Sequence, residues 1–119
     1  MSATGNSLLD ATGNSLRGLV SGAGSERAVR YELTLLAVAL PLGAVIAPSI
    51  AWYVAMIGVL LATLAVEFVN TAIEKLADRV TREHDAAIGR VKDLGSAAVF
   101  CMLCLCVLVW AGACAVRFI

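Results

Sequence analysis

The stretch from residue 67 to residue 78, EFVNTAIEKLAD, directly follows a run from Ile50 to Val66 that carries no charge. On a helix with 3.6 residues per turn, the carboxylates of Glu67, Glu74 and Asp78 fall within about 40° of one another. They form one acidic stripe at the end of an apolar helix. This pattern predicts a membrane-spanning helix whose end carries a polar site.

Asn70 lies roughly 60° to one side of this stripe, where it can act as a neutral hydrogen-bonding partner. Carboxylates stacked on one face repel one another unless a cation lies among them, and Mg²⁺ is commonly held by one or two carboxylates plus substrate phosphates. The alternative is a solvated helix face on which Lys75 and Arg79 neutralise the acids. Because Glu67 still belongs to the apolar helix, where an ionisable group is costly and usually functional, we favour a metal site.

The composition indicates an integral membrane protein. Of the 119 residues, 61% are hydrophobic and the mean hydropathy is +0.89, whereas soluble domains are typically about 45–50% apolar. The formal net charge is zero, so no long-range field attracts nucleic acid, and none is expected as a partner. The four cysteines all fall in the last apolar run and are expected to serve in packing.

Three apolar runs predict an all-α protein with transmembrane helices at about residues 29–48, 50–70 and 96–117. Pro48 and Ser49 predict a tight turn between the first two helices, and Pro41 predicts a kink in the first. A polar loop is expected at residues 81–90. Residues 26–119 are thus predicted to form the transmembrane domain.

Residues 1–25 are predicted to form a separate polar or amphipathic surface segment. They are rich in Ser, Gly, Thr and Asn and contain a repeat, ATGNSL, at residues 3–8 and 11–16. Leucines at roughly helical intervals predict a short helix on the membrane surface. Gly22 and Gly24 are expected to end it, and Ser21 or Ser25 to cap the next helix.

The basic residues predict the orientation. Eight of the nine lie before the first apolar run or between the second and third. By the positive-inside rule, the N-terminus and the 75–96 loop are expected in the cytoplasm and the C-terminus in the periplasm, across a bacterial inner membrane.

This topology places acidic and basic residues from three helices at one membrane face. Phosphoryl transfer needs mainly positioning, a metal that bridges the phosphates, cationic groups and a carboxylate near the attacking hydroxyl. The sequence has no Walker loop and no Gly-rich kinase loop, so any kinase activity belongs to an unrelated kind of site.

Two motifs, EFVNTAIEKLADR at residues 67–79 and RVKDLGSAA at residues 90–98, resemble the prokaryotic diacylglycerol kinase family, and ERAVRYE at residues 26–32 is similar to a third motif of that family. The resemblance covers about residues 14–119. It implies a homotrimeric enzyme with three transmembrane helices and a surface helix in each chain, which transfers the γ-phosphate of ATP to diacylglycerol to give phosphatidic acid. The family also contains undecaprenol kinases, but DLGSAA at residues 93–98 looks more like the diacylglycerol branch.

The resemblance also implies roles for individual residues. Glu67 would be the general base on the lipid hydroxyl, and Glu26 and Glu74 would bind Mg²⁺. An arginine that the family often has near Ser7, and an aromatic residue near Asn14, are absent here. The implied nucleotide-binding residues are Asn14, Glu26, Asn70, Glu74, Glu83, His84, Asp85, Lys92 and Asp93, and the implied lipid-binding residues are Arg30, Glu32, Glu67 and Ser96.

Two other classes of function compete with a kinase. An ion-coupled transporter needs its carboxylate near the membrane midplane, whereas Glu67 lies about 17 residues, or roughly 25 Å, from Ile50 and so near the membrane boundary. A noncatalytic scaffold would explain the helices but not the polar clusters gathered on one face.

Overall fold

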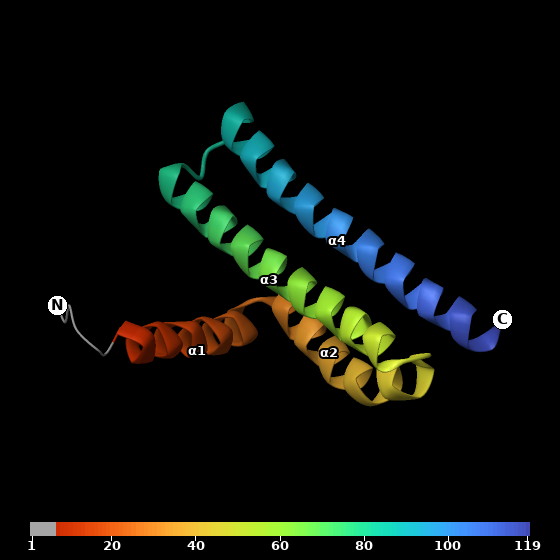
Figure 1. The fold of residues 1–119 in the computed structure, drawn as a ribbon. Helices are drawn as coiled ribbons and strands as arrows, with labels where there is room; N and C mark the ends of the chain where they lie inside the picture. The colour runs from red at the N-terminus through yellow and green to blue at the C-terminus, as the bar shows by residue number, and fades with distance from the viewer. Residues whose placement is uncertain (1–6) are drawn as a thin grey trace.

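In the computed structural model, which describes residues 7–119, the chain forms four helices (Figure 1). They are α1 (Ser7–Ser25), α2 (Arg27–Ile46), α3 (Ile50–Val80) and α4 (Ala86–Phe118). Within residues 7–119 there is no strand, which confirms the all-α prediction. Most of the first copy of the repeat, at residues 3–8, lies outside the described residues.

The helices α2, α3 and α4 are each long and apolar enough to cross a membrane, as predicted. At 1.5 Å per residue α3 and α4 are about 46 Å and 50 Å long, longer than the hydrocarbon core of about 30 Å. The charged residues of α3 all lie from Glu67 onward, and three of the four in α4 lie at residues 90–93, so the excess length is expected at the end where residues 81–85 join the two helices.

The expected loop at residues 81–90 was too long. Helix α4 begins at Ala86 because Asp85 caps it, its carboxylate accepting hydrogen bonds from the backbone nitrogens of Ala87 (2.9 Å) and Ile88 (3.1 Å). An acceptor at this position satisfies amide groups that have no partner within the helix. The cap was not predicted, because the last helix was expected to begin only after the charged residues of the loop.

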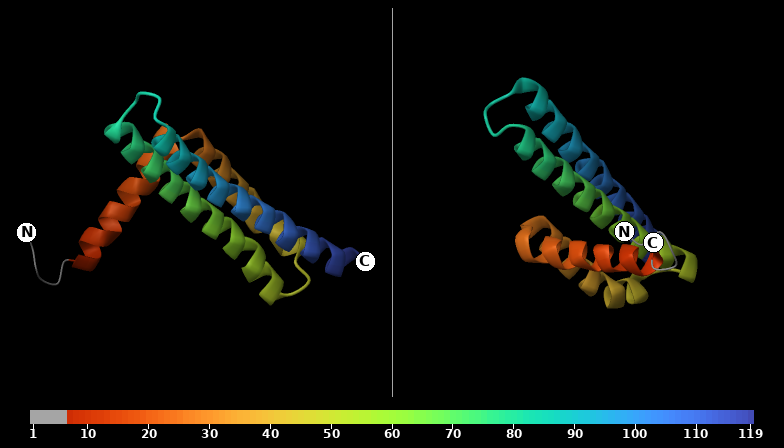
Figure 2. Two further views of the ribbon diagram at one scale, coloured as in Figure 1. Left: turned by 90° about the horizontal axis from the view of Figure 1, so that it is seen from above. Right: turned by 90° about the vertical axis from the view of Figure 1, so that its left-hand side faces the viewer.

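Helices α3 and α4 lie side by side as an antiparallel hairpin, and this is the most extensive helix contact in the described chain (Figures 1 and 2). Thr63 Oγ1 lies 3.0 Å from Cys106 Sγ, and both side chains are buried. The indole of Trp110 donates to the carbonyl oxygen of Met56 at 3.2 Å. Polar contacts thus join the two helices within the apolar layer, where few competing partners exist.

Helix α2 packs against α3 and continues through Pro41. The turn between them follows the prediction, because Ser49 caps α3 by accepting from the backbone nitrogen of Trp52 at 3.3 Å. The hydroxyl of Tyr53 donates to the carbonyl oxygen of Leu40 at 2.8 Å. These contacts fix α2 along one half of the α3–α4 hairpin.

Helix α1 points away from the other helices (Figure 2), and leucines at several positions along it are exposed. The expectation that Gly22 and Gly24 end this helix is wrong, since both lie within it. The expected serine cap is also wrong. The hydroxyl of Ser25 donates back to the carbonyl oxygen of Ser21 at 2.8 Å and so continues α1. Only Glu26 separates α1 from α2.

Candidate active site at the α1–α2 junction

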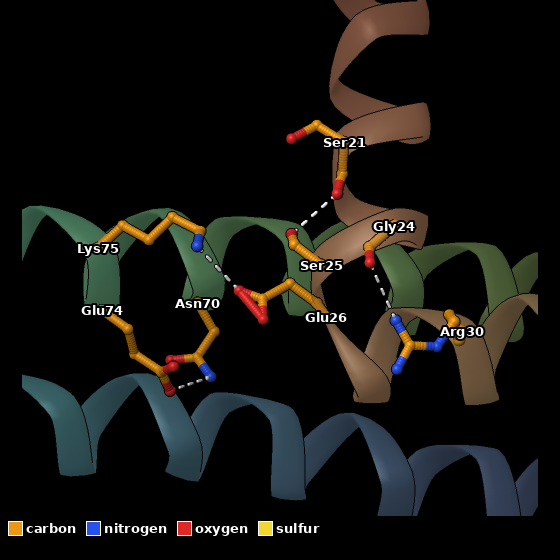
Figure 3. Close-up of polar contacts among 8 residues, drawn as sticks. All are labelled: Ser21, Gly24, Ser25, Glu26, Arg30, Asn70, Glu74 and Lys75. Carbon is orange, nitrogen blue, oxygen red and sulfur yellow. Dashed lines mark hydrogen bonds and ion pairs between the residues drawn. The ribbon is translucent and has the colours of Figure 1, made fainter.

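The junction of α1 and α2 brings Glu26 against α3 (Figure 3). Glu26 has an extended backbone and no side-chain capping bond, so its carboxylate is free to interact with another helix. It lies 3.1 Å from the ammonium group of Lys75. The structure therefore joins residue 26 to the stretch that the sequence singled out.

Glu67, Asn70 and Glu74 form the α3 side of the site. Glu67 is 8% exposed and Asn70 is 7% exposed. The Asn70 amide nitrogen donates to Glu74 Oε1 at 3.2 Å (Figure 3). The charges of Glu74 and Glu26 both repel a charge on Glu67. The charges of Glu26, Glu67 and Glu74 therefore interact with one another. The sequence predicted this for Glu67 and Glu74, which belong to the same acidic stripe.

Asn70 fits into α4 where Gly95 has no side chain. A Cβ atom at Gly95 would overlap the amide oxygen of Asn70. This oxygen is buried and has no hydrogen-bond partner among the described residues. The sequence pattern at residues 90–98 gives no sign of this fit, because Asn70 and Gly95 lie on different helices.

Asp78, the third member of the stripe, is engaged with α4. The ammonium group of Lys92 donates to Asp78 Oδ1 at 2.6 Å. Asp78 lies in the part of α3 that continues beyond the membrane, and the hydrogen bond from Lys92 lowers the pKa of its carboxyl group. This pair joins the helices near the loop.

The nucleotide-binding residues predicted in the loop between α3 and α4 gather around a cavity. This cavity of about 320 Å³ is lined by Arg82, Glu83, His84, Asp85 and Lys92, together with Thr81, Ile88 and Gly89. The structure thus brings Lys92 together with residues 83–85. Asp85 already serves as the cap of α4 through one carboxylate oxygen.

Two predicted lipid-binding residues of α2 have different surroundings. The guanidinium of Arg30 donates to the carbonyl oxygens of Ala23 (3.2 Å) and Gly24 (3.3 Å), at the end of α1. Glu32 Oε2 is buried without a hydrogen-bond partner among the described residues, and its charge and that of Glu67 repel each other. Glu32 therefore belongs to the same acidic site, whereas Arg30 holds α1.

Three other predicted residues are exposed. Asp93 and Ser96 lie on α4 on either side of buried Gly95. Asn14 lies on α1, where its side-chain oxygen accepts a hydrogen bond from Arg17. None of these three forms a hydrogen bond or ion pair with Glu67 in residues 7–119, so the described part of the chain does not bring them into the acidic site.

The oxygen donors present fit a magnesium ion that arrives with phosphates. Residues 7–119 contain no group of three or more His, Cys, Asp or Glu side chains able to hold a metal unaided. Glu26 and Glu74 supply two carboxylates, and Mg²⁺ usually takes one or two from the protein and completes its shell with water and phosphate oxygens. The ammonium group of Lys75 pairs with the Glu26 carboxylate and partly offsets the negative charge of the site.

Comparison with known proteins shows the family of this chain. Residues 13–114 match the family model of prokaryotic diacylglycerol kinase. The chain belongs to this family. It is 37% identical over 105 residues to a diacylglycerol kinase of Haemophilus influenzae, covering 88% of this chain and 89% of the relative. It is 38% identical over 104 residues to one of Pseudomonas aeruginosa, covering 87% and 85%.

A diacylglycerol kinase of Escherichia coli is 31% identical over 103 residues, with 87% of this chain and 84% of the relative covered. The family match at residues 13–114 includes α1 from Gly13 onward, the α1–α2 junction, α2, α3 and α4 as far as Cys114. The chain is therefore an enzyme of a kinase family.

Proposed function

We propose that this protein is an ATP-dependent kinase that phosphorylates diacylglycerol to phosphatidic acid at the cytoplasmic face of a bacterial inner membrane. The observation that carries this proposal is the burial of Glu67 among Glu26, Asn70 and Glu74 at the depth where α3 leaves the membrane. A lipid hydroxyl at the headgroup level and a phosphate from the cytoplasm can meet there.

Glu67 would act as the general base. Its carboxylate accepts the proton of the lipid hydroxyl while that oxygen forms a bond to the γ-phosphorus of ATP and the bond to the ADP oxygen breaks. Glu67 suits this role because it is the deepest carboxylate of the α3 stripe, about two turns closer to the membrane than Glu74. A positioned base contributes typically about 10²- to 10⁴-fold to a rate.

Glu26 and Glu74 would hold Mg²⁺, which when bound neutralises the phosphate charge that develops during transfer. Asn70 would orient Glu74 through the hydrogen bond that it donates. Lys92 and residues 83–85 line the loop cavity and would contact the nucleotide. Asp93, Ser96 and Asn14 would complete the nucleotide and lipid contacts at exposed positions. Arg30 and Glu32 would face the lipid headgroup from α2.

We further propose that the protein works as a homotrimer with sites shared between chains. Exposed Asp93 and Ser96 and the exposed apolar faces of the three spans can meet a second copy. Mixing two variants expected to be inactive, Glu67→Gln and Asp93→Asn, tests this arrangement, because a shared site can then combine the intact Glu67 of one chain with the intact Asp93 of another. We expect activity to return in mixed oligomers; no recovery at any mixing ratio would show that each chain works alone.

The test of the function is ATP-dependent phosphorylation of diacylglycerol and of undecaprenol in the same detergent micelles. We expect diacylglycerol to be the better substrate. Preference for undecaprenol would assign the protein to the other branch of the family. If neither lipid is phosphorylated and ATP is not hydrolysed, but vesicles that contain the protein show proton-coupled cation uptake, the result would favour a small transporter instead.

A further inference from the structure

Helix α1 meets α3 where Gly22 contacts Phe68. Gly22 is the buried residue of α1, and a Cβ atom placed on it would lie 2.5 Å from Cε1 of the Phe68 ring. Real Cβ contacts are essentially never that short, so the ring occupies the space that a side chain would need. At Gly18 and Gly24, on the same helix, a Cβ atom would meet nothing within 4 Å. With the Phe68 ring in this position, a side chain has room at residues 18 and 24 but not at residue 22.

This contact lies between two residues of the candidate active site. The backbone nitrogen of Glu26 donates to the carbonyl oxygen of Gly22 at 2.9 Å. Phe68 directly follows Glu67 on α3. A shift of Gly22 away from the ring would thus move the backbone that carries Glu26 relative to the one that carries Glu67.

Arg30 fastens the other side of the junction. Its guanidinium donates to the carbonyl oxygens of Ala23 and Gly24, the latter contact being drawn in Figure 3. Its backbone nitrogen donates to the carbonyl oxygen of Glu26 at 3.1 Å. Because carbonyl groups at a helix C-terminus lack intrahelical partners, a cation is well placed there. Arg30 thereby fixes the direction in which α1 leaves α2.

The position of the Gly22–Phe68 contact along α3 indicates where α1 lies relative to the membrane. Phe68 lies about 18 residues, or roughly 27 Å, along α3 from Ile50, close to the thickness of the hydrocarbon core. The Gly22–Phe68 contact is therefore at the membrane boundary, where the exposed leucines of α1 can enter the interface.

We infer that Phe68, packed against Gly22, and Arg30, bound to the end of α1, are positioning residues that keep Glu26 beside α3, where Glu26 and Glu74 can hold the same ion. The inference rests on the metal role proposed for Glu26. A side chain at position 22 would displace α1 and turn Glu26 away. The affinity for Mg²⁺ would fall, while turnover at saturating Mg²⁺ would change little because Glu67 stays in place.

Enlarging residue 22 and shortening the side chain of residue 68 tests the contact between them. Gly22→Ala adds the Cβ atom that would lie 2.5 Å from Cε1, and Phe68→Leu removes the ring atoms Cε1 and Cζ and leaves a shorter side chain that ends at its Cδ atoms. We expect Gly22→Ala to raise the Mg²⁺ concentration for half-maximal activity about tenfold. A tenfold change corresponds to about 1.4 kcal/mol, which is near the low end of the cost of overpacking a close contact. The double variant should restore the wild-type Mg²⁺ concentration, and Gly24→Ala should leave it unchanged.

A distance measurement separates this inference from the proposed function. Spin labels at Ser15 and Leu76, both exposed, in a background without the native cysteines, report the position of α1 relative to α3. Gly22→Ala should shift or broaden the distance distribution, and the Gly22→Ala, Phe68→Leu double variant should restore it. This readout remains informative even if the protein does not phosphorylate diacylglycerol.

Three results would overturn the inference. The first is an unchanged distance distribution in Gly22→Ala. The second is an equal change in Gly24→Ala. The third is a clear displacement of α1 with wild-type Mg²⁺ dependence, which would show that the contact places the surface helix without positioning Glu26.

Discussion

The α3–α4 hairpin and the α1–α2 junction (residues 22–30) hold the candidate active site from two sides and differ in construction. The hairpin is joined along its length by Thr63 with Cys106, Trp110 with Met56, and Asp78 with Lys92. The junction depends on a single non-helical residue, Glu26, without a side-chain cap. Regions with few buried contacts open more easily than packed ones. The hairpin should therefore determine stability, and the junction should determine metal affinity.

The largest expected effect is at Glu67, on the hairpin side. Glu67→Gln keeps nearly the same shape but cannot accept the hydroxyl proton, so turnover should fall about 10²- to 10⁴-fold. Nucleotide affinity, measured by titration, should stay near the wild-type value. Turnover within about threefold of wild type, well below the loss expected for a base, would remove Glu67 from the catalytic role.

An intermediate effect is expected at Gly95, where the hairpin leaves room for Asn70. Gly95→Ala should cost about 1–3 kcal/mol through overpacking and lower turnover by displacing the Asn70–Glu74 hydrogen bond. Gly58→Ala is the matched control, because it lies on the other helix of the hairpin, away from the polar residues, and a Cβ atom there would meet nothing within 4 Å. Unfolding in mixed detergent micelles and lipid phosphorylation measure the two effects. Equal behaviour of the two variants would contradict the assigned role of Gly95.

The smallest expected effect is at Thr63, within the apolar layer. Thr63→Val removes the hydroxyl that lies beside Cys106 and should cost roughly 0.6 kcal/mol, the average for hydrogen bonds between membrane helices. Turnover should not change. Thr34→Val provides the control, since the exposed Thr34 hydroxyl also donates to a carbonyl oxygen one turn earlier on its helix. A loss of activity in Thr63→Val without a loss of stability would show that this contact between α3 and α4 contributes to catalysis and not only to stability.

The comparison also explains what could be predicted from the sequence. The hairpin helices and the Glu67–Glu74 face follow from local patterns, namely uncharged runs of membrane length and acids at helical spacing. The junction does not follow from such patterns. Gly22 and Gly24 are typical helix breakers because glycine has low helix propensity, yet both lie within α1, and the missing side chain of Gly22 leaves room for the Phe68 ring. The use of Gly95 by Asn70 likewise depends on a contact between helices distant in sequence.

The central claim is that the junction and the hairpin supply ligands to one metal ion, Glu26 from the first and Glu74 from the second. The most direct measurement is a double-mutant cycle on the Mg²⁺ dependence of diacylglycerol phosphorylation, with wild type, Glu26→Gln, Glu74→Gln and the double variant. Each single substitution should weaken Mg²⁺, since an amide lacks the charge that binds a hard cation. The account predicts a coupling of about 0.5–3 kcal/mol between the two sites. Effects that add within about 0.5 kcal/mol, or a normal Mg²⁺ dependence in either single variant, would contradict it.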